Sequence, residues 1–239
     1  MSIAENVARV RASIAAAARE AGRDPAEITL VAATKTQSDN LIREAIAAGI
    51  TVCGENRVQE MTAHLDTDAY AGSDLHFIGH LQTNKVRFVV GRVDMIESVD
   101  SSRLLEAIDR QAAKLALVQD VLIEVNIGGE ASKSGAAPQE LEELVRLAQS
   151  LPHVRLRGLM AIPPADPPGG SRRFFREMHQ LYVDITEKLE DNRDDFNCLS
   201  MGMSGDYEDA VREGATHVRV GTALFGARPP LHPPVENLI

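Results

Sequence analysis

The sequence predicts an α/β protein, a (β/α)8 TIM barrel with an extra helix at its N-terminus. Eight short apolar runs alternate with amphipathic segments, and 239 residues is a usual length for one such barrel. An open, doubly wound sheet could carry the same alternation. No GxGxxG pattern follows the first run, however, and this favours the closed barrel. We therefore expect a single domain over residues 1–239.

The predicted strands are the apolar runs, which polar or turn-forming residues bound on both sides. They cover Ile28–Lys35, Thr51–Asn56, Leu75–His80, Met95–Asp100, Val121–Ile127, Val154–Ile162, Cys198–Met203 and His217–Gly221. The carboxyl ends of the strands form one face of a barrel, and active sites lie on that face. The residues that end these runs are therefore the first candidates for a functional site.

The N-terminal segment is predicted to be an amphipathic helix and not a transit peptide. Ser2 and Glu5 form a capping-box pattern, and the acidic Glu5 and Glu20 are residues that transit peptides avoid. Apolar residues recur on one face, at Ile3, Val7, Val10 and Ile14. Further helices are expected at Ser38–Ala48, Arg57–His64, Asn84–Val90, Ser102–Leu115, Pro138–Ser150, Arg172–Asp191 and Tyr207–Glu213.

The composition excludes several classes of function. A net charge of -10 leaves no basic surface for a nucleic-acid backbone. No apolar stretch has the length that crossing a membrane requires. Cys53 and Cys198 lie far apart in apolar runs, so neither a disulfide nor a metal site is expected. A soluble, cytoplasmic protein fits these features.

Lys35 is the most informative single residue, because it ends the first predicted strand. Removing an ammonium group from water is costly, so a lysine at the tip of a buried strand is a candidate for chemical use. A desolvated lysine can act as an amine nucleophile, the usual anchor for an aldehyde cofactor such as pyridoxal phosphate. Side chains alternate along a strand, and one choice of face per strand directs Lys35, Asn56 and Arg219 into the same barrel mouth.

The ends of the seventh and eighth strands predict a phosphate site, because barrel enzymes often bind phosphate with these two loops. The residues concerned are Ser200, Gly202, Ser204, Gly221 and Thr222. Glycines allow backbone amides to approach an anion, and Ser204 can cap the helix that follows it. The alternative is that all five are turn and capping residues.

Four charged or polar residues near the rim have two interpretations each. Arg219, inside an apolar strand, could form a structural ion pair or bind the ring nitrogen of pyridoxal phosphate. Glu55 could be a general base, although a salt bridge at the barrel rim suits it better. His76 and His80 lack the helical spacing and glutamate of a metalloprotease motif and are interpreted as hydrogen-bonded polar residues.

Several segments together resemble the pyridoxal phosphate homeostasis proteins of the YggS/PROSC type. These are Ala33-Thr-Lys-Thr36, Gly54-Glu-Asn-Arg-Val-Gln-Glu60, His76-Phe-Ile-Gly-His-Leu-Gln-Thr-Asn-Lys85, Leu199-Ser-Met-Gly-Met-Ser204 and Val218-Arg-Val-Gly-Thr-Ala-Leu-Phe-Gly226. That family is similar to the N-terminal barrel domain of alanine racemase. The resemblance implies a Schiff base from Lys35 to pyridoxal phosphate, with Asn56 beside the ring and Arg219 at its nitrogen. It implies a phosphate site made by Ser200, Gly202, Ser204, Gly221 and Thr222.

The resemblance implies a protein that holds pyridoxal phosphate for intracellular homeostasis and delivers it to apo forms of pyridoxal phosphate enzymes, with little or no catalysis. A monomer is expected. The alternative is a racemase or related amino-acid enzyme, which needs a second acid or base opposite Lys35; Tyr207 and His80 are the weak candidates. A third interpretation is a cofactor-free barrel enzyme that acts on phosphorylated sugars.

Overall fold

The computed structural model describes residues 1–130, 134–165, 167–189 and 194–226, and in these residues eight parallel strands close into a barrel. The strands are β1 (Thr29–Ala33), β2 (Val52–Glu55), β3 (Asp74–Phe77), β4 (Met95–Val99), β5 (Gln119–Val125), β6 (Val154–Ala161), β7 (Cys198–Ser200) and β8 (His217–Val220). Each strand pairs with the next, and β8 returns to β1, where Arg219 is paired with Val31. The predicted (β/α)8 barrel is confirmed.

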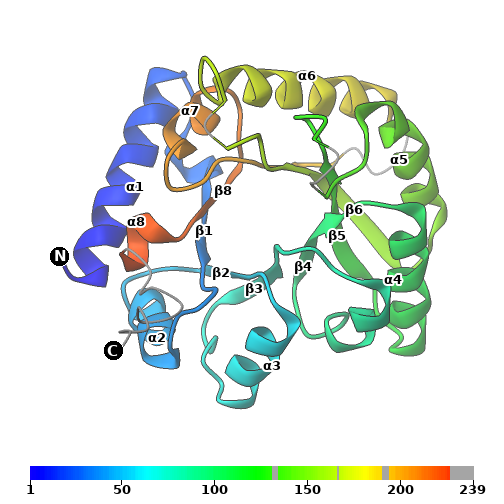
Figure 1. Ribbon diagram of the computed structural model, residues 1–239, viewed down its shortest axis with the longest axis horizontal. Coiled ribbons are helices and arrows are strands. Elements are labelled where there is room, and N and C mark those ends of the chain that lie inside the picture. The colour runs from blue at the N-terminus through cyan, green and yellow to red at the C-terminus, as the bar shows by residue number, and fades with distance from the viewer. Residues whose placement is uncertain (131–133, 166, 190–193, 227–239) are drawn as a thin grey trace, which may run out of the picture.

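Helices surround the strands on the outside of the barrel (Figure 1). They are α1 (Ile3–Glu20), α2 (Asp39–Ala47), α3 (Val58–Asp66), α4 (Ser102–Lys114), α5 (Leu141–Ser150), α6 (Arg172–Lys188), α7 (Tyr207–Arg212) and α8 (Thr222–Phe225), with short 3-10 helices η1 (Pro25–Glu27), η2 (Thr83–Phe88) and η3 (Pro138–Glu140). No helix in the described residues has the length and apolar character needed to span a bilayer.

The extra N-terminal helix is confirmed, and it contacts α8, the short helix that follows β8. Ser2 and Glu5 form both bonds of the capping box, and the predicted apolar stripe of α1 is buried. α1 lies beside α8 (Figure 1), and the Asn6 side chain donates to the carbonyl oxygen of Leu224 at 2.8 Å. Arg9 donates to the carbonyl oxygen of Ala223, also at 2.8 Å. The short helix α8 is therefore held by its neighbour as well as by its own hydrogen bonds.

The structure corrects several predicted elements. The expected helix at Asn84–Val90 is the 3-10 helix η2, and the one expected from Pro138 begins as η3 before continuing as α5. Helix α8, just after Gly221, was not predicted, because four residues carry no helical periodicity. The predicted helix from Arg172 ends at Lys188, and residues 190 and 191 lie outside the described part. The strands are shorter than their apolar runs at the carboxyl ends, where the backbone turns into the loops.

The barrel interior is divided into an apolar layer and a polar layer. Met95, Leu122, Met160 and Cys198 form the apolar layer inside the strands. Two residues further along three of these strands, the inward side chains are Glu97, Glu124 and Ser200, and all three are buried. The larger hydrophobic core lies between the strands and the helices. The polar layer therefore lies towards the carboxyl ends of the strands, the face at which barrel enzymes bind their ligands.

Candidate functional site

The sequence predicts that Lys35 is the last residue of the first strand. In the structure Lys35 lies in a turn just beyond β1. The strand ends at Ala33, and Thr36 adopts a left-handed backbone conformation with φ of 66°, which ends the extended chain. The amide of Thr36 donates to Glu60 Oε2 at 2.8 Å, so the turn is anchored on its outer side. Lys35 itself is half-buried. Lys35 nevertheless lies at the carboxyl end of the first strand, as predicted.

Asn56 follows β2, the strand beside β1, and its side chain presents a buried acceptor. Within the described residues, Asn56 Oδ1 has no hydrogen-bond partner. A buried acceptor without a partner is costly, so a bound ligand with a donor group would satisfy it. The backbone here is closely packed: a Cβ atom at Gly79 would lie 2.1 Å from the Asn56 carbonyl oxygen. The loop geometry therefore limits where the Asn56 side chain can lie.

Glu55 was expected to form a salt bridge at the rim, and this expectation is wrong. Its side chain is completely buried on the outer side of the barrel wall, where Oε2 accepts a hydrogen bond from Tyr70 at 3.3 Å. Oε1 accepts from the Asn56 amide at 2.6 Å. Burial raises the pKa of the Glu55 carboxyl above its usual range. Glu55 therefore organises the loop that carries Asn56.

Ser204 lies at the rim and contacts the start of α8. Ser204 Oγ accepts hydrogen bonds from the amides of Gly221 at 3.1 Å and Ala223 at 3.2 Å. The prediction that Ser204 caps α7, the helix that follows it, is therefore wrong. Ser204 instead caps α8, the short helix that follows the neighbouring strand β8. Because its oxygen accepts from both amides, the Ser204 hydroxyl keeps its proton, which it can donate to a bound anion. Thr222, the first residue of α8, is exposed beside them.

Gly202 allows this loop to form. Its φ is 91°, and a Cβ atom there would lie 2.4 Å from the Cβ of Ala210 in α7. Its carbonyl oxygen accepts a hydrogen bond from the Arg219 amide at 3.0 Å, which connects the β7 loop to β8. A side chain at this position would push the β7 loop away from α7. Gly202 therefore acts through its backbone conformation.

Arg219 is buried inside the barrel, where Ser200 is its main partner. Arg219 Nη1 donates to Ser200 Oγ at 2.6 Å, and Nη2 donates to the carbonyl oxygen of Ala161 at 2.9 Å. Glu97 Oε2 lies 3.9 Å from Nη1, so the structural ion pair considered for Arg219 is present. These bonds use two of the five N–H groups of a guanidinium, which leaves donors for a ligand. The structure thus places Ser200 with Arg219, inside the barrel, and Ser204 with Gly221, at the rim.

Glu97 and Glu124 are site residues that the sequence interpretation missed. Each is an acidic residue inside a strongly apolar strand, which is an unusual position for an unpaired carboxyl group. Alternation along the strand would have directed both into the barrel with Met95 and Leu122. Burial raises the pKa of Glu124 to about 7, although the charge of Arg219 opposes this shift.

The raised pKa of Glu124 predicts a pH-dependent stability. The folded protein holds this proton more tightly than the unfolded chain, whose carboxyl has the ordinary value of 4.5. Glu124 therefore costs stability as the pH rises from about 4.5 to about 7, and a shift of this size corresponds to about 3 kcal/mol. Relative to wild type, Glu124→Gln should gain about 2.5 kcal/mol more stability at pH 8 than at pH 5, because part of the cost is already present at pH 5. Urea unfolding of both proteins at the two pH values measures this gain.

The control for Glu124 is Glu44→Gln, which changes an exposed carboxylate on α2. Its stability relative to wild type should not depend on pH in this interval. An equal effect of Glu124→Gln at pH 5 and pH 8 would contradict the assignment of a buried, protonated carboxyl.

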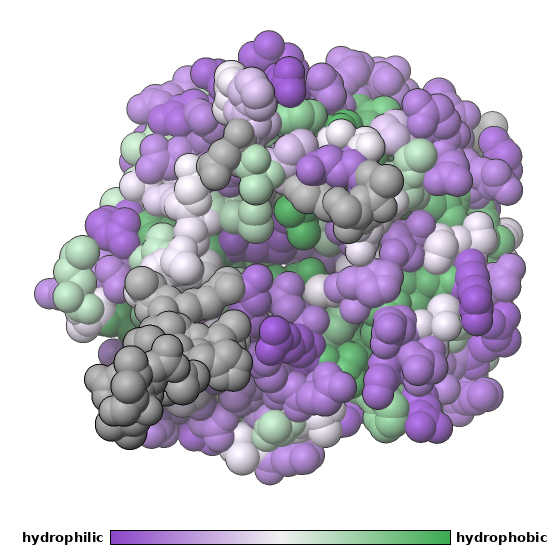
Figure 2. Space-filling view, viewed as in Figure 1, coloured by the Kyte–Doolittle hydropathy of each residue, from purple (hydrophilic) through white to green (hydrophobic). Residues whose placement is uncertain are grey.

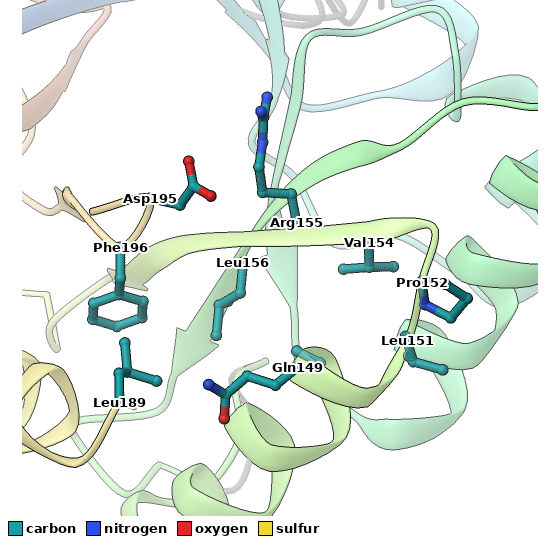
Figure 3. A pocket seen from close by; sticks show the side chains of 10 residues that line it. Gln149, Leu151, Pro152, Val154, Arg155, Leu156, Leu189, Asp195 and Phe196 are labelled. Carbon is teal, nitrogen blue, oxygen red and sulfur yellow. The ribbon is translucent and has the colours of Figure 1, made fainter. Parts of the chain in front are cut away.

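Two cavities lie at opposite ends of the barrel. A cavity of about 630 Å³, at the carboxyl ends of the strands, is lined in part by Met203 and Asp206, on the loop that carries Ser204. A smaller cavity of about 280 Å³ lies at the start of β6, where Val154, Leu189 and Phe196 contribute to its lining (Figure 3). In Figure 2 hydrophilic residues cover most of the visible surface, and hydrophobic residues show between them. Only the larger cavity adjoins the candidate site.

Comparison with known proteins identifies the family of this chain. The family model described as alanine racemase, N-terminal domain, matches residues 3–229. Proteins named pyridoxal phosphate homeostasis protein are 42% identical in Aquifex aeolicus and 43% identical in Escherichia coli. The alignments cover 95% of this chain and 99% and 97% of those proteins. The chain belongs to the family of pyridoxal phosphate homeostasis proteins, as its sequence motifs predict.

Solved structures show the same barrel. A structure described as an unknown protein from Bifidobacterium adolescentis has a TM-score of 0.84 and 41% identity, over 93% of this chain and 94% of that chain. PipY from Synechococcus elongatus, described with PLP bound, has a TM-score of 0.79 and 35% identity, over 94% of this chain and all of PipY. Alanine racemase from Clostridium difficile shares the fold, with a TM-score of 0.72 and 15% identity, and the match covers 57% of that longer chain.

Proposed function

We propose that this protein binds pyridoxal 5'-phosphate for homeostasis of the cofactor and delivers it to apo-enzymes. The observation that carries the proposal is the arrangement at the carboxyl end of the barrel. The Lys35 amine just after β1 and the unpaired Asn56 acceptor just after β2 lie at the same rim as the Ser204 hydroxyl, on which two amides next to β8 converge. The names of the relatives, and the PLP bound to PipY, support the same cofactor.

The residues present fit this cofactor. Lys35 Nζ would condense with the aldehyde, forming a carbon–nitrogen double bond with loss of water. Asn56 would lie beside the ring, with its unpaired Oδ1 available to a donor group. The Ser204 hydroxyl would donate to the phosphate group, with Gly202, Gly221 and Thr222 around it. Arg219 would donate to the ring nitrogen, and Ser200 is assigned to Arg219 because of their 2.6 Å contact.

A holding role suits these residues better than catalysis. Pyridoxal phosphate supplies an electron sink when its ring nitrogen is protonated, and a guanidinium donor at that nitrogen opposes protonation. A racemase also needs an acid or base on each side of its substrate. His80 is exposed and bonded to Ser134 at 3.2 Å, and Tyr207 is buried. We therefore propose a cytoplasmic, monomeric carrier. Solvent-deuterium exchange at the α-carbon of an added amino acid would favour the racemase alternative.

Comparing pyridoxal phosphate with pyridoxal, which lacks the phosphate group, tests the proposed site. Adding pyridoxal phosphate should produce a visible absorbance band, and inorganic phosphate should compete with it. Pyridoxal should bind on the order of a hundredfold more weakly, because the charge-assisted hydrogen bonds to the phosphate group, including the one from the Ser204 hydroxyl, are lost. A protein that stays colourless with pyridoxal phosphate, or that binds pyridoxal equally well, would overturn the proposal.

A further inference from the structure

A chain of buried hydrogen bonds connects side chains from four strands and ends at Arg219. Glu97 on β4 is fully buried, and its two carboxylate oxygens have different partners. Oε2 lies 2.6 Å from Ser200 Oγ on β7, and Oε1 lies 2.7 Å from His76 Nδ1 on β3. Ser200 Oγ in turn lies 2.6 Å from Arg219 Nη1 on β8. The chain therefore runs from His76 through Glu97 and Ser200 to Arg219.

The chemistry of these groups determines the direction of each bond. A guanidinium only donates and a carboxylate only accepts, whereas a hydroxyl has one proton and can also accept. Ser200 must therefore accept from Arg219 and donate its proton to Glu97. Burial opposes ionisation of Glu97, but the hydrogen bond and charge of His76 and the charge of Arg219 outweigh it and lower the pKa of Glu97 to about 2. Glu97 is thus a carboxylate at neutral pH.

We propose that Glu97 is a positioning residue for Arg219, which it orients through the Ser200 hydroxyl and whose charge it balances at the ring end of the cofactor site. This role rests on the proposed function, because it assigns Arg219 to the ring nitrogen of pyridoxal phosphate. With Nη1 bound to Ser200 and Nη2 bound to the Ala161 carbonyl oxygen, rotation of the guanidinium would break a buried hydrogen bond. Both bonds that orient Arg219 are therefore made by the protein itself.

The other charged groups around Arg219 leave Glu97 as its main counter-charge. Burial lowers the pKa of His217, on the same strand, to about 4, so this ring is neutral at pH 7. Glu124 on β5 has a pKa raised to about 7 and is only partly ionised there. Asp206, beyond β7, interacts with Arg219 more weakly than either glutamate. A cation this deeply buried requires a negative partner, and Glu97 is the carboxylate joined to Arg219 through the Ser200 hydroxyl, the relay between them.

Glu97→Gln removes the charge and keeps the size of the side chain. The site then becomes more positive, which disfavours a proton on the Lys35 nitrogen in the cofactor-bound protein. The pH midpoint of the visible band should fall by on the order of one unit while the cofactor stays bound. Ser200→Ala keeps both charges and removes only the relay. It should weaken pyridoxal phosphate binding about tenfold with a smaller change of midpoint.

The matched control is Asp120→Asn, because Asp120 is a buried carboxylate paired with arginines at the opposite end of the barrel. It lies 2.6 Å from Arg155 Nε and 2.8 Å from Arg157 Nη1, at the start of β5. This variant can lose stability, but it should keep the wild-type midpoint and affinity. A purely structural role for Glu97 predicts the same behaviour in Glu97→Gln, so the pH midpoint distinguishes the two roles.

The outcomes separate this inference from the proposed function. Circular dichroism first establishes that each variant is folded; if Glu97→Gln is not, the affinity and midpoint of Ser200→Ala decide. Folded variants with the affinity and pH midpoint of wild type would overturn the positioning role while leaving cofactor binding intact. A wild-type protein that shows no visible band would overturn the proposed function, and the positioning role with it.

Discussion

Lys35→Ala should abolish covalent retention of pyridoxal phosphate and leave the fold unchanged. Lys35 is the only lysine at the carboxyl end of β1, and its side chain is half-buried and outside the hydrophobic core, so the barrel does not depend on it. Borohydride reduction of the wild-type protein with pyridoxal phosphate should attach one cofactor, which mass spectrometry detects. The alanine variant should remain unlabelled and colourless, because the proposed link to the aldehyde needs the Lys35 amine.

Two further variants make the Lys35 experiment specific. Lys35→Arg keeps a positive charge that attracts phosphate but cannot condense with an aldehyde, so it should bind the cofactor only non-covalently. Lys114→Ala removes an exposed amine at the end of α4, far from the site in the sequence, and should be labelled like wild type. Full labelling of Lys35→Ala would show that another amine forms the link.

Gly158→Ala should have the largest effect on stability of the substitutions considered. Gly158 has φ of 148° in β6, and a Cβ atom there would lie 1.8 Å from the Cys198 carbonyl oxygen in β7. The two residues are paired across the strands, so only separation of β6 and β7 could relieve this contact. A closed barrel tolerates such separation poorly, and we expect a loss of at least about 4 kcal/mol, or failure to fold. Urea unfolding and soluble yield measure the effect.

Gly205→Ala provides the control for Gly158→Ala. No atom lies within 4 Å of a Cβ added at Gly205, and its φ is outside the left-handed region. This variant should unfold within about 0.5 kcal/mol of wild type. Equal stability of the two variants would show that the strand pair can absorb a side chain at position 158.

The sequence located the candidate residues best where the ends of strands carried unusual residues. Alternation along the strands placed Lys35, Asn56 and Arg219 at one face, and the pairing of β1 with β2 and β8 brings the three strands together. It could not place Ser204, because its partners belong to α8, a helix too short to leave a periodic pattern. The turn at Thr36 was missed for a similar reason, since its φ of 66° reflects an anchor on Glu60 that is distant in sequence.

The sequence by itself determined the class of fold, the motif residues and the family, because these depend on periodicity and local residue patterns. Only the tertiary structure decided which polar groups meet inside the barrel. Ser200 is joined to Glu97, 103 residues away, and to Arg219, and neither contact has a local signal. The physical reason is that barrel closure buries these groups together, and each buried polar group must then find a partner among residues distant in the chain. Burial also sets the ionisation of Glu97 and Glu124, which the sequence interpretation had not assigned to the site.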